Sequence, residues 1–195
     1  SLPERFVLKA NHGSAMNLIC VDKGTLDTPK TKRILNRWLR TQQAFRSIEP
    51  QYEKIKRKII CEAYIDDGIN KLPTDYKVYC FNGQPKYIMA ISDRDNSIKK
   101  IIYDLDWNPT DFTKDEYSIE DIHCKPRNLE KMLHYAEKLS APFPFVRADF
   151  YDTGERVYFG ELTFTPMAGF NTNLTPEAQY ILGSLIELPE PLLNI

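Results

Sequence analysis

A predicted β-hairpin near the C-terminus constrains this chain more than any other feature of its sequence. Two segments of alternating apolar and polar residues, 146–150 and 158–163, flank Asp152-Thr153-Gly154, whose residue types favour a turn. Asp149 and Glu161 then project from neighbouring strands, where alternation can place them on the same face. Two carboxylates on rigid strands are costly unless a cation or a reaction needs them. Mg²⁺ prefers hard oxygen ligands. The hairpin therefore predicts a site for a Mg²⁺ ion that bridges the phosphates of a nucleotide.

The composition predicts one domain, or two closely joined subdomains, with a real core. Of the 195 residues, 42% are hydrophobic and 27% charged, as in globular proteins. The formal net charge of −1 argues against polyanion binding as the main function, while it leaves room for local basic patches. We find no nucleic-acid signature in the sequence.

The sequence contains neither a signal peptide nor an apolar run near the about eighteen residues of a transmembrane helix. We therefore expect a cytoplasmic protein. Since a strand pattern already begins by Phe6, we expect the chain to be a piece of something longer.

The cysteines predict buried, reduced thiols. Four of them are widely spaced without a C-x-x-C pair, and three lie in apolar strand-like runs. The three histidines do not flank cysteines at the spacing of zinc ligands, apart from His123-Cys124, so we expect no zinc site.

Alternation and turn residues predict a set of strands beyond the hairpin. We expect strands at residues 5–10, 17–21, 58–65, 76–81, 86–91 and 100–104. The strand at 58–65 is expected to be buried. Asn82-Gly83 between two of the strands is a strong signal for a type I′ turn.

Helical spacing predicts three helices. The first is capped by Thr28, with Pro29 at its first position, and packs one apolar face on a sheet through Ile34, Leu35, Trp38, Leu39 and Phe45. The second is capped by Asn128, runs through Ser140, and directs inward Leu129, Met132, Leu133, Ala136 and Leu139. A short last helix begins at Thr175-Pro176. Helices mixed with mostly antiparallel strands, without βαβ alternation, predict the α+β class.

Candidate ligand-binding residues lie near the N-terminus. Lys9 ends an apolar strand just before Asn11-His12-Gly13-Ser14, so it can reach phosphate oxygens that loop N–H groups also bind. A solvent-exposed lysine before an ordinary turn explains the same pattern. Glu62 lies in an apolar strand, and either faces solvent or borders a cleft where the backbone of residues 63–65 binds a purine.

Charges in the middle of the chain have two interpretations. Asp75, Lys77 and Lys86 alternate with aromatic residues, as on the solvated face of a hairpin. Arg94 lies between Asp93 and Asp95, where it can bind phosphate or a substrate carboxylate, or belong to a self-neutralising loop.

Arg147 and Asp149 lie two positions apart and face the same way. A structural salt bridge is one explanation. With Glu161 opposite, we favour the functional one, in which Arg147 stabilises negative charge in a transition state and Asp149 holds metal. His12 is either a general acid or a turn residue, and nothing local decides between them.

Several segments of the chain resemble the ATP-grasp superfamily, and within it the TupA-like branch associated with teichuronopeptide and cell-surface polysaccharide synthesis. The similarity runs from about Phe6 to Phe170. The matching segments are residues 6–14, 104–108, 144–150 and 159–166. The last two are specific, while Asp104-Leu105-Asp106-Trp107-Asn108 points to the branch.

The resemblance implies an ATP-grasp fold in which two α+β subdomains, 1–65 and 66–195, clasp a nucleotide. It implies that ATP phosphates contact Lys9 and a loop that includes His12, Gly13 and Ser14, and that adenine contacts Glu62 and the backbone of Ala63, Tyr64 and Ile65. Asp75 and Lys77 are expected to bind the nucleotide as well. Mg²⁺ is expected on Asp149, Glu161 and Thr163, and Arg147 and Arg94 are the expected catalytic residues.

Family resemblance also implies a reaction. ATP-grasp enzymes typically join a carboxylate to an amine after phosphorylating the carboxylate. Phosphorylation converts the carboxylate oxygen, a poor leaving group, into a phosphate, which is a good one. The metal ion and an arginine offset the negative charge that gathers at the reacting groups. We therefore expect a ligase in cell-surface polysaccharide or peptide-polymer synthesis.

Three departures from the family pattern limit this expectation. Thr163 stands where many members have an asparagine ligand, and Ala15 replaces a glycine of the phosphate loop. The usual preceding N-terminal domain, which often completes the substrate site, is missing from the sequence. Two alternatives therefore stay open: a nucleotide-binding module that needs another domain or chain, and a kinase of a sugar hydroxyl.

Overall fold

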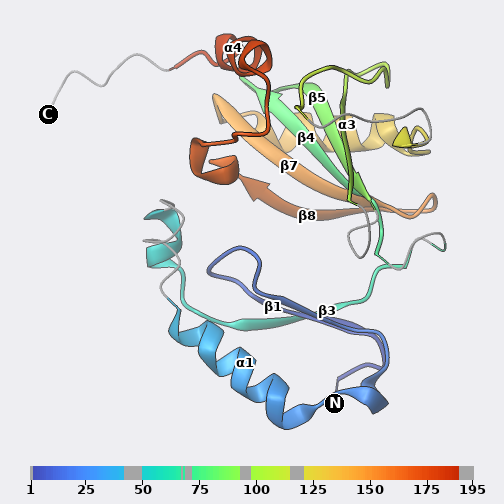
Figure 1. Cartoon of the computed structure of the whole chain (residues 1–195), viewed down its shortest axis with the longest axis vertical. Helices are drawn as coiled ribbons and strands as arrows, with labels where there is room; N and C mark the ends of the chain where they lie inside the picture. Colours follow the sequence, from blue (N-terminus) through green and yellow to red (C-terminus); the bar gives the residue numbers. More distant parts are fainter. Residues whose placement is uncertain are drawn as a thin grey trace, which may run out of the picture. The chain divides into compact units, whose positions relative to one another are not determined.

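The computed structural model describes residues 2–41, 50–66, 68, 72–92, 98–114 and 121–188. The chain divides into two compact units, Ser1–Ile65 and Asp66–Ile195, which we call unit 1 and unit 2. Each unit combines one antiparallel sheet with helices, which confirms the predicted α+β class (Figure 1).

Unit 1 is built on a three-stranded sheet, sheet A, in the order β2-β1-β3. Its strands are β1 (Phe6–Ala10), β2 (Asn17–Cys20) and β3 (Ile59–Ala63). The helix α1 (Thr28–Arg40) packs on one face, where Leu35 contacts a small core of Phe6, Leu8 and Cys20. Two short 3₁₀ helices, η1 (Lys23–Thr25) and η2 (Pro50–Lys54), complete the unit.

The start of α1 differs from the prediction by one residue. Asp27, not Thr28, caps the helix, since its Oδ1 accepts a hydrogen bond from the Lys30 N–H at 2.8 Å. Phe45, expected on the apolar face of this helix, lies outside the described residues.

The prediction of a buried strand at 58–65 is wrong. β3 is an edge strand of sheet A, and Ile60 is 42% exposed. A continuous apolar run is typical of a buried strand, but among the described residues only β1 pairs with β3, on one of its sides.

Unit 2 contains a five-stranded sheet, sheet B, in the order β6-β5-β4-β7-β8. Its strands are β4 (Asp75–Phe81), β5 (Gln84–Ser92), β6 (Lys99–Tyr103), β7 (Phe145–Asp152) and β8 (Val157–Thr163). The helices among its described residues are α3 (Leu129–Ser140), η4 (Pro166–Gly169) and α4 (Pro176–Ser184). The predicted hairpin between β7 and β8 is confirmed.

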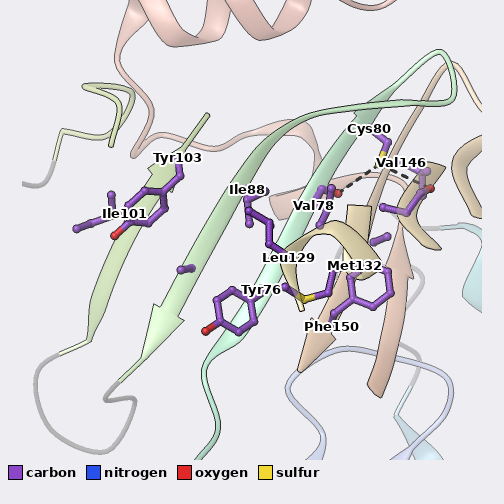
Figure 2. Packing of buried hydrophobic residues seen from close by; sticks show 13 residues of the cluster. Tyr76, Val78, Cys80, Ile88, Ile101, Tyr103, Leu129, Met132, Val146 and Phe150 are labelled. Atoms are coloured by element: carbon purple, nitrogen blue, oxygen red, sulfur yellow. Dashed lines mark hydrogen bonds between the residues drawn. The ribbon is translucent and has the colours of Figure 1, made fainter. Parts of the chain in front are cut away.

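One face of sheet B packs against α3, and Figure 2 shows this core. Val78, Ala148 and Phe150 of the strands are fully buried with Met132 and Ala136 of the helix. Leu139, predicted to point inward, is instead 36% exposed.

The predicted cap residue of α3, Asn128, makes side-chain hydrogen bonds to the β7–β8 turn and none to the helix itself. Its side chain makes no cap hydrogen bond with the helix. Instead its Nδ2 donates to Asp152 Oδ1 at 2.8 Å and to the Gly154 carbonyl oxygen at 3.2 Å. The helix is thereby fixed to the turn of the β7–β8 hairpin.

The opposite face of sheet B is apolar at one end only. There Tyr79, Phe81 and Met89 pack against Ala178 and Leu182 of α4. The helix begins where predicted, and Thr175 caps it, since its Oγ1 accepts a hydrogen bond from the Ala178 N–H at 3.2 Å. The polar part of this face therefore lies along β4, β7 and β8.

The four cysteines are free, as expected, but the prediction that all are buried is wrong. Cys20 and Cys80 are buried, whereas Cys61 and Cys124 are exposed. Burial raises the pKa of Cys80 to about 11, so this thiol is unreactive at neutral pH. None of the helices in the described ranges is long and apolar enough to cross a membrane.

The predicted type I′ turn between β4 and β5 is confirmed, because Asn82 has φ of 51° and Gly83 has φ of 77°. A Cβ on Gly83 would lie 3.1 Å from Ala141 Cα, which is backbone and cannot swing away.

We expect Gly83→Ala to lower the free energy of unfolding by about 1–2 kcal/mol, because alanine in the left-handed region is strained. Chemical denaturation of unit 2 measures this loss. The matched control is Gly183→Ala in α4, where a Cβ meets nothing within 4 Å. This control should be neutral or stabilising by up to about 1 kcal/mol. Equal effects at the two positions would contradict the role of the turn.

Candidate functional site

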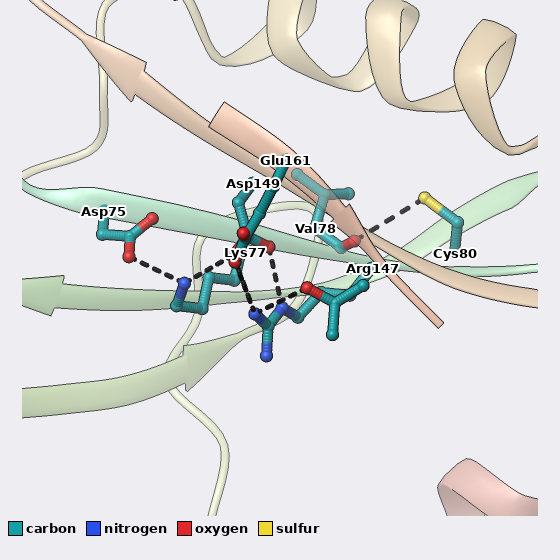
Figure 3. A network of polar contacts seen from close by, with 8 residues as sticks. Asp75, Lys77, Val78, Cys80, Arg147, Asp149 and Glu161 are labelled. Atoms are coloured by element: carbon teal, nitrogen blue, oxygen red, sulfur yellow. Dashed lines mark hydrogen bonds and ion pairs between the residues drawn. The ribbon is translucent and has the colours of Figure 1, made fainter. Parts of the chain in front are cut away.

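β4, β7 and β8 bring a set of charged side chains together on the face of sheet B away from α3 (Figure 3). The register pairs Lys77 with Asp149 across β4 and β7, and Asp149 with Glu161 across β7 and β8. Directly opposed residues share a face, so the three side chains are neighbours. We call Asp75, Lys77, Arg147, Asp149 and Glu161 the charged cluster.

A β-bulge in β8 determines that Glu161 lies on this face. The register shifts between Asp149 and Phe150, and Gly160 is the additional residue of β8. A Cβ on Gly160 would lie 3.2 Å from the Asp149 carbonyl oxygen. The bulge lets Glu161 face the charged cluster while Phe159 pairs with Phe150 on the side of α3.

Asp149 is the most buried acid of the cluster, with a side chain only 4% exposed. Arg147 binds it in bidentate fashion, with Nε 2.7 Å from Oδ1 and Nη2 2.8 Å from Oδ2. Burial by itself lowers the pKa of Arg147, but the hydrogen bonds and charge of Asp149 raise it overall. Arg147 therefore stays positive, and its Nη2 also donates to Thr163 Oγ1 at 3.1 Å.

Lys77 lies between two acids. Its Nζ is 2.5 Å from Asp149 Oδ2 and 2.7 Å from Asp75 Oδ2. The Lys77 side chain is 14% exposed and that of Asp75 7%. The interpretation as a solvated hairpin face is therefore wrong for these two residues, although it holds for the exposed Lys86. Alternation alone did not reveal that Asp149 of β7 lies beside Lys77 on this face.

Glu161 is the accessible acid of the cluster. Its side chain is 64% exposed, and its closest ion-pair contact is 4.0 Å, from Oε1 to Arg147 Nη2. Loss of hydration next to the sheet raises its pKa, and the charge of Asp149 raises it further, while Lys77 and Arg147 oppose the shift. The carboxylates of Asp149 and Glu161 thus repel one another, and a bound cation would relieve this repulsion.

Tyr79 is a residue of the site that sequence reasoning missed. It lies opposite Arg147 in the register of β4 and β7 and is 5% exposed. Burial raises the pKa of its hydroxyl, and the hydrogen bond and charge of Arg147 partly oppose this. Its position two residues after Lys77 in the same strand was the available signal.

The charged cluster has a donor set that fits Mg²⁺, with one restriction. Its three carboxylates and two cations leave a net charge of −1, and Glu161 has free oxygen lone pairs. Both oxygens of Asp149 already accept hydrogen bonds, so this acid can ligate a metal only through its remaining lone pairs. Within the described part of the chain, no three acid, histidine or cysteine side chains lie close enough to form a metal site by themselves.

In unit 1, Lys9 pairs with Glu62. Lys9 Nζ lies 2.5 Å from Glu62 Oε2, and the two side chains are 33% and 45% exposed. Both lie on the face of sheet A away from α1, because Leu8, which alternates with Lys9, packs toward α1. Each residue thus has the other as its ion-pair partner. Their roles in nucleotide binding stay predictions.

The loop after β1 is held at its start by two side chains. Asn11 Oδ1 accepts from the Lys58 N–H at 2.8 Å, which fastens the loop to the start of β3. His12 is 2% exposed, and its Nε2 donates to the Trp38 carbonyl oxygen of α1 at 2.9 Å. Within the described part of the chain its Nδ1 has no hydrogen-bond partner. Ala15 has φ of 57°, a conformation that a glycine would adopt without strain.

Gly13 and Ser14 follow these two anchored residues, and Ser14 is exposed. Ala63 ends β3, and Tyr64 and Ile65 follow at the boundary between the two units. Arg5 stacks over the Tyr64 ring, with its Cζ 4.1 Å from the ring centroid. Arg94 lies outside the described residues.

The segment 104–108 is a turn that anchors Trp107. Asp104 accepts hydrogen bonds from the Asn108 N–H and Nδ2, both at 2.8 Å. The Trp107 ring then stacks on Tyr103 with centroids 4.2 Å apart and planes at 3°. The motif thus packs Trp107 against sheet B.

Comparison with known proteins decides the family. The model of the TupA-like ATP-grasp family matches residues 1–187. The chain belongs to this family. It therefore has the ATP-grasp fold, and the resemblance found in the sequence is confirmed. A search of curated proteins found none that matches.

Solved structures of two ligases are similar to this TupA-like chain. The D-alanine–D-alanine ligase of Bacillus anthracis complexed with ATP is 15% identical with a TM-score of 0.48, over 92% of this chain and 47% of the ligase. The ATP-grasp ligase PsnB, complexed with a precursor variant, Mg and ADP, is 13% identical with a TM-score of 0.44, over 93% and 45%. The chain thus spans about half the length of these ligases.

We expect Lys77→Met to destabilise unit 2 by about 3 kcal/mol at neutral pH, since it leaves Asp75 and Asp149 buried with less compensation. Urea denaturation at neutral pH measures the loss. Lys86→Met, at an exposed lysine of the same sheet, should change stability by less than about 0.5 kcal/mol. A loss at Lys77 no larger than that at Lys86 would show that the charge of Lys77 is not what matters.

Proposed function

We propose that this chain carries the ATP- and Mg²⁺-binding part of a carboxylate–amine ligase. The observation that carries the proposal is the charged cluster itself. In a chain of the ATP-grasp family, β4, β7 and β8 hold Arg147, Asp149 and Glu161 together on one face of sheet B. Packing alone does not explain why the neighbouring charges of Lys77, Arg147 and Asp149 are largely buried at such cost.

In unit 2, Glu161 and Asp149 are the proposed ligands of Mg²⁺, with Thr163 as a weaker or water-mediated third. When bound, Mg²⁺ neutralises phosphate charge and orients the transferred phosphoryl group. Arg147, held in place by Asp149 and Thr163, then offers its remaining N–H groups to negative charge that develops in the transition state. Arg94 is proposed as a second cation for this purpose. Lys77 and Asp75 position Asp149.

In unit 1, Lys9 is proposed to bind ATP phosphates. Its pair with Glu62 is exposed, and such pairs are worth at most about 1 kcal/mol, so Lys9 can change partner at little cost. The N–H groups of the loop that includes His12, Gly13 and Ser14 are proposed to bind other phosphate oxygens. Glu62 and the backbone of residues 63–65 are the proposed contacts of adenine.

The proposed reaction has two steps. A substrate carboxylate attacks the γ-phosphorus of ATP, which forms an acyl phosphate and releases ADP. An amine then attacks the acyl carbon, which forms the amide and releases phosphate. We propose a substrate in cell-surface polysaccharide or peptide-polymer synthesis, on the basis of the family alone. The second candidate is a nucleotide-binding module that is catalytically incomplete without another domain or chain.

A thermal shift with ATP, with and without Mg²⁺, tests nucleotide binding. Ligand at about a hundred times its Kd stabilises by roughly 2.7 kcal/mol. For a chain of this size we expect the Tm to rise by about 5–10 °C in the presence of Mg²⁺. A full shift without metal would contradict the metal assignment, and no shift at all would contradict the proposal.

Lys9→Ala should reduce this shift, whereas Lys58→Ala, at an exposed lysine beside β3, should not. Release of ADP that requires both a carboxylate and an amine supports the ligase. Binding without any acceptor-dependent release supports the module instead.

We expect Glu161→Gln to weaken Mg·ATP binding by about tenfold, because a neutral amide is a poorer ligand. Since the pKa of Glu161 is raised, wild-type affinity should begin to fall at a pH above the ordinary glutamate value of about 4.3 as pH decreases. Titrations of Mg·ATP at several pH values measure this. Glu155→Gln in the β7–β8 turn is the control, at an exposed acid of the same hairpin. Equal affinity in wild type and Glu161→Gln would remove this residue from the site.

A further inference from the structure

The two units carry opposite formal charges, which the net charge of −1 conceals. Unit 1 contains thirteen lysines and arginines against six aspartates and glutamates, a formal charge of +7. Unit 2 contains thirteen against twenty-one, a formal charge of −8. The expectation that polyanion binding is not a main function therefore does not extend to unit 1.

The helix α1 concentrates this positive charge. It contains no acid between Thr28 and Arg40, but five lysines and arginines. Of these, Lys30, Arg33 and Arg37 follow one face of the helix at spacings of three and four residues, and all three are exposed. No described residue forms an ion pair with any of the three. Together with Ile34 they line a shallow hollow of about 340 Å³.

This hollow is distinct from the Lys9 site. The opposite side of α1 packs on sheet A, where Leu35 contacts the core and Thr31 is buried (Figure 1). Lys9 and Glu62 lie on the other face of that sheet. The nucleotide contacts proposed above therefore do not account for the cations of the hollow.

The lining of the hollow favours one class of partner. Cations one helical turn apart present charges about 5–6 Å from one another, and Ile34 adds an apolar contact among them. An acidic polypeptide supplies both carboxylates and apolar side chains, whereas an acidic glycan or a nucleic-acid backbone supplies mainly the anions. A membrane-inserted helix would need its apolar side free, but α1 uses that side to pack on sheet A.

We infer that the outer face of α1 docks an acidic segment of a partner protein, whose carboxylates pair with Lys30, Arg33 and Arg37 while an apolar side chain contacts Ile34. Each exposed ion pair contributes little, so affinity depends on several at once and falls with added salt. This docking does not depend on the proposed ligase reaction.

Fluorescence anisotropy of a labelled glutamate-rich peptide with regularly spaced leucines tests the inference. The full chain is used without nucleotide or metal, so that the result is independent of ATP binding. We expect salt-sensitive binding that the triple variant Lys30→Gln, Arg33→Gln, Arg37→Gln weakens by about tenfold or more. Ile34→Ser should weaken binding of this peptide but not of poly-L-glutamate, which has no apolar side chain.

The matched control is the triple variant Lys125→Gln, Lys131→Gln, Lys138→Gln, which removes the same charge from exposed positions in and before α3. It should retain wild-type affinity, and thermal melts confirm that all variants fold. Equal affinity in both triple variants, or no binding of the peptide, would overturn the inference. So would tighter binding to duplex DNA, polygalacturonate or phosphatidylserine vesicles than to the peptide.

Discussion

Compensation of the buried Asp149 carboxylate is the constraint on which unit 2 depends. Asp149 lies in β7, one of the inner strands of sheet B, and its two oxygens are bound by Arg147 of the same strand and Lys77 of β4. A buried carboxylate without these partners would cost several kcal/mol. The same contacts orient Arg147 and leave Glu161 as the exposed acid, so one network both stabilises the sheet and shapes the candidate site.

The two units differ in how far their charged side chains are buried. In unit 2, Lys77 and Arg147 are bound within the protein and mostly buried. In unit 1, the Lys9–Glu62 pair is exposed and Lys30, Arg33 and Arg37 form no ion pair with a described residue. Exposed pairs are weak and exchange readily, whereas buried ones are persistent. Unit 1 is therefore suited to bind anions from solution, and unit 2 to hold a rigid arrangement of acids and cations.

Much of the architecture was predictable because local signals and the fold agree. Asn82-Gly83 needs positive φ at both positions, which favours a type I′ turn whatever the surroundings. The spacing of Met132 and Ala136 identifies the buried side of α3. Predictions of burial failed where packing against another element determines it. β3 has an apolar sequence but lies at an edge of sheet A, and Leu139 fits the helical pattern but is partly exposed. Burial depends on what packs against a segment, which its own residues do not specify.

The sequence by itself determined the α+β class, the hairpin and the residue types of the candidate site, since alternation and turn chemistry are local properties. The resemblance of its motifs also indicated the TupA-like ATP-grasp family to which the chain belongs. Only the tertiary structure decided that Lys77 lies between Asp75 and Asp149, that Tyr79 joins the site, and that the Gly160 bulge directs Glu161 to the charged face. These depend on the register between strands distant in sequence. A shift of one residue would turn each of these side chains to the opposite face of sheet B.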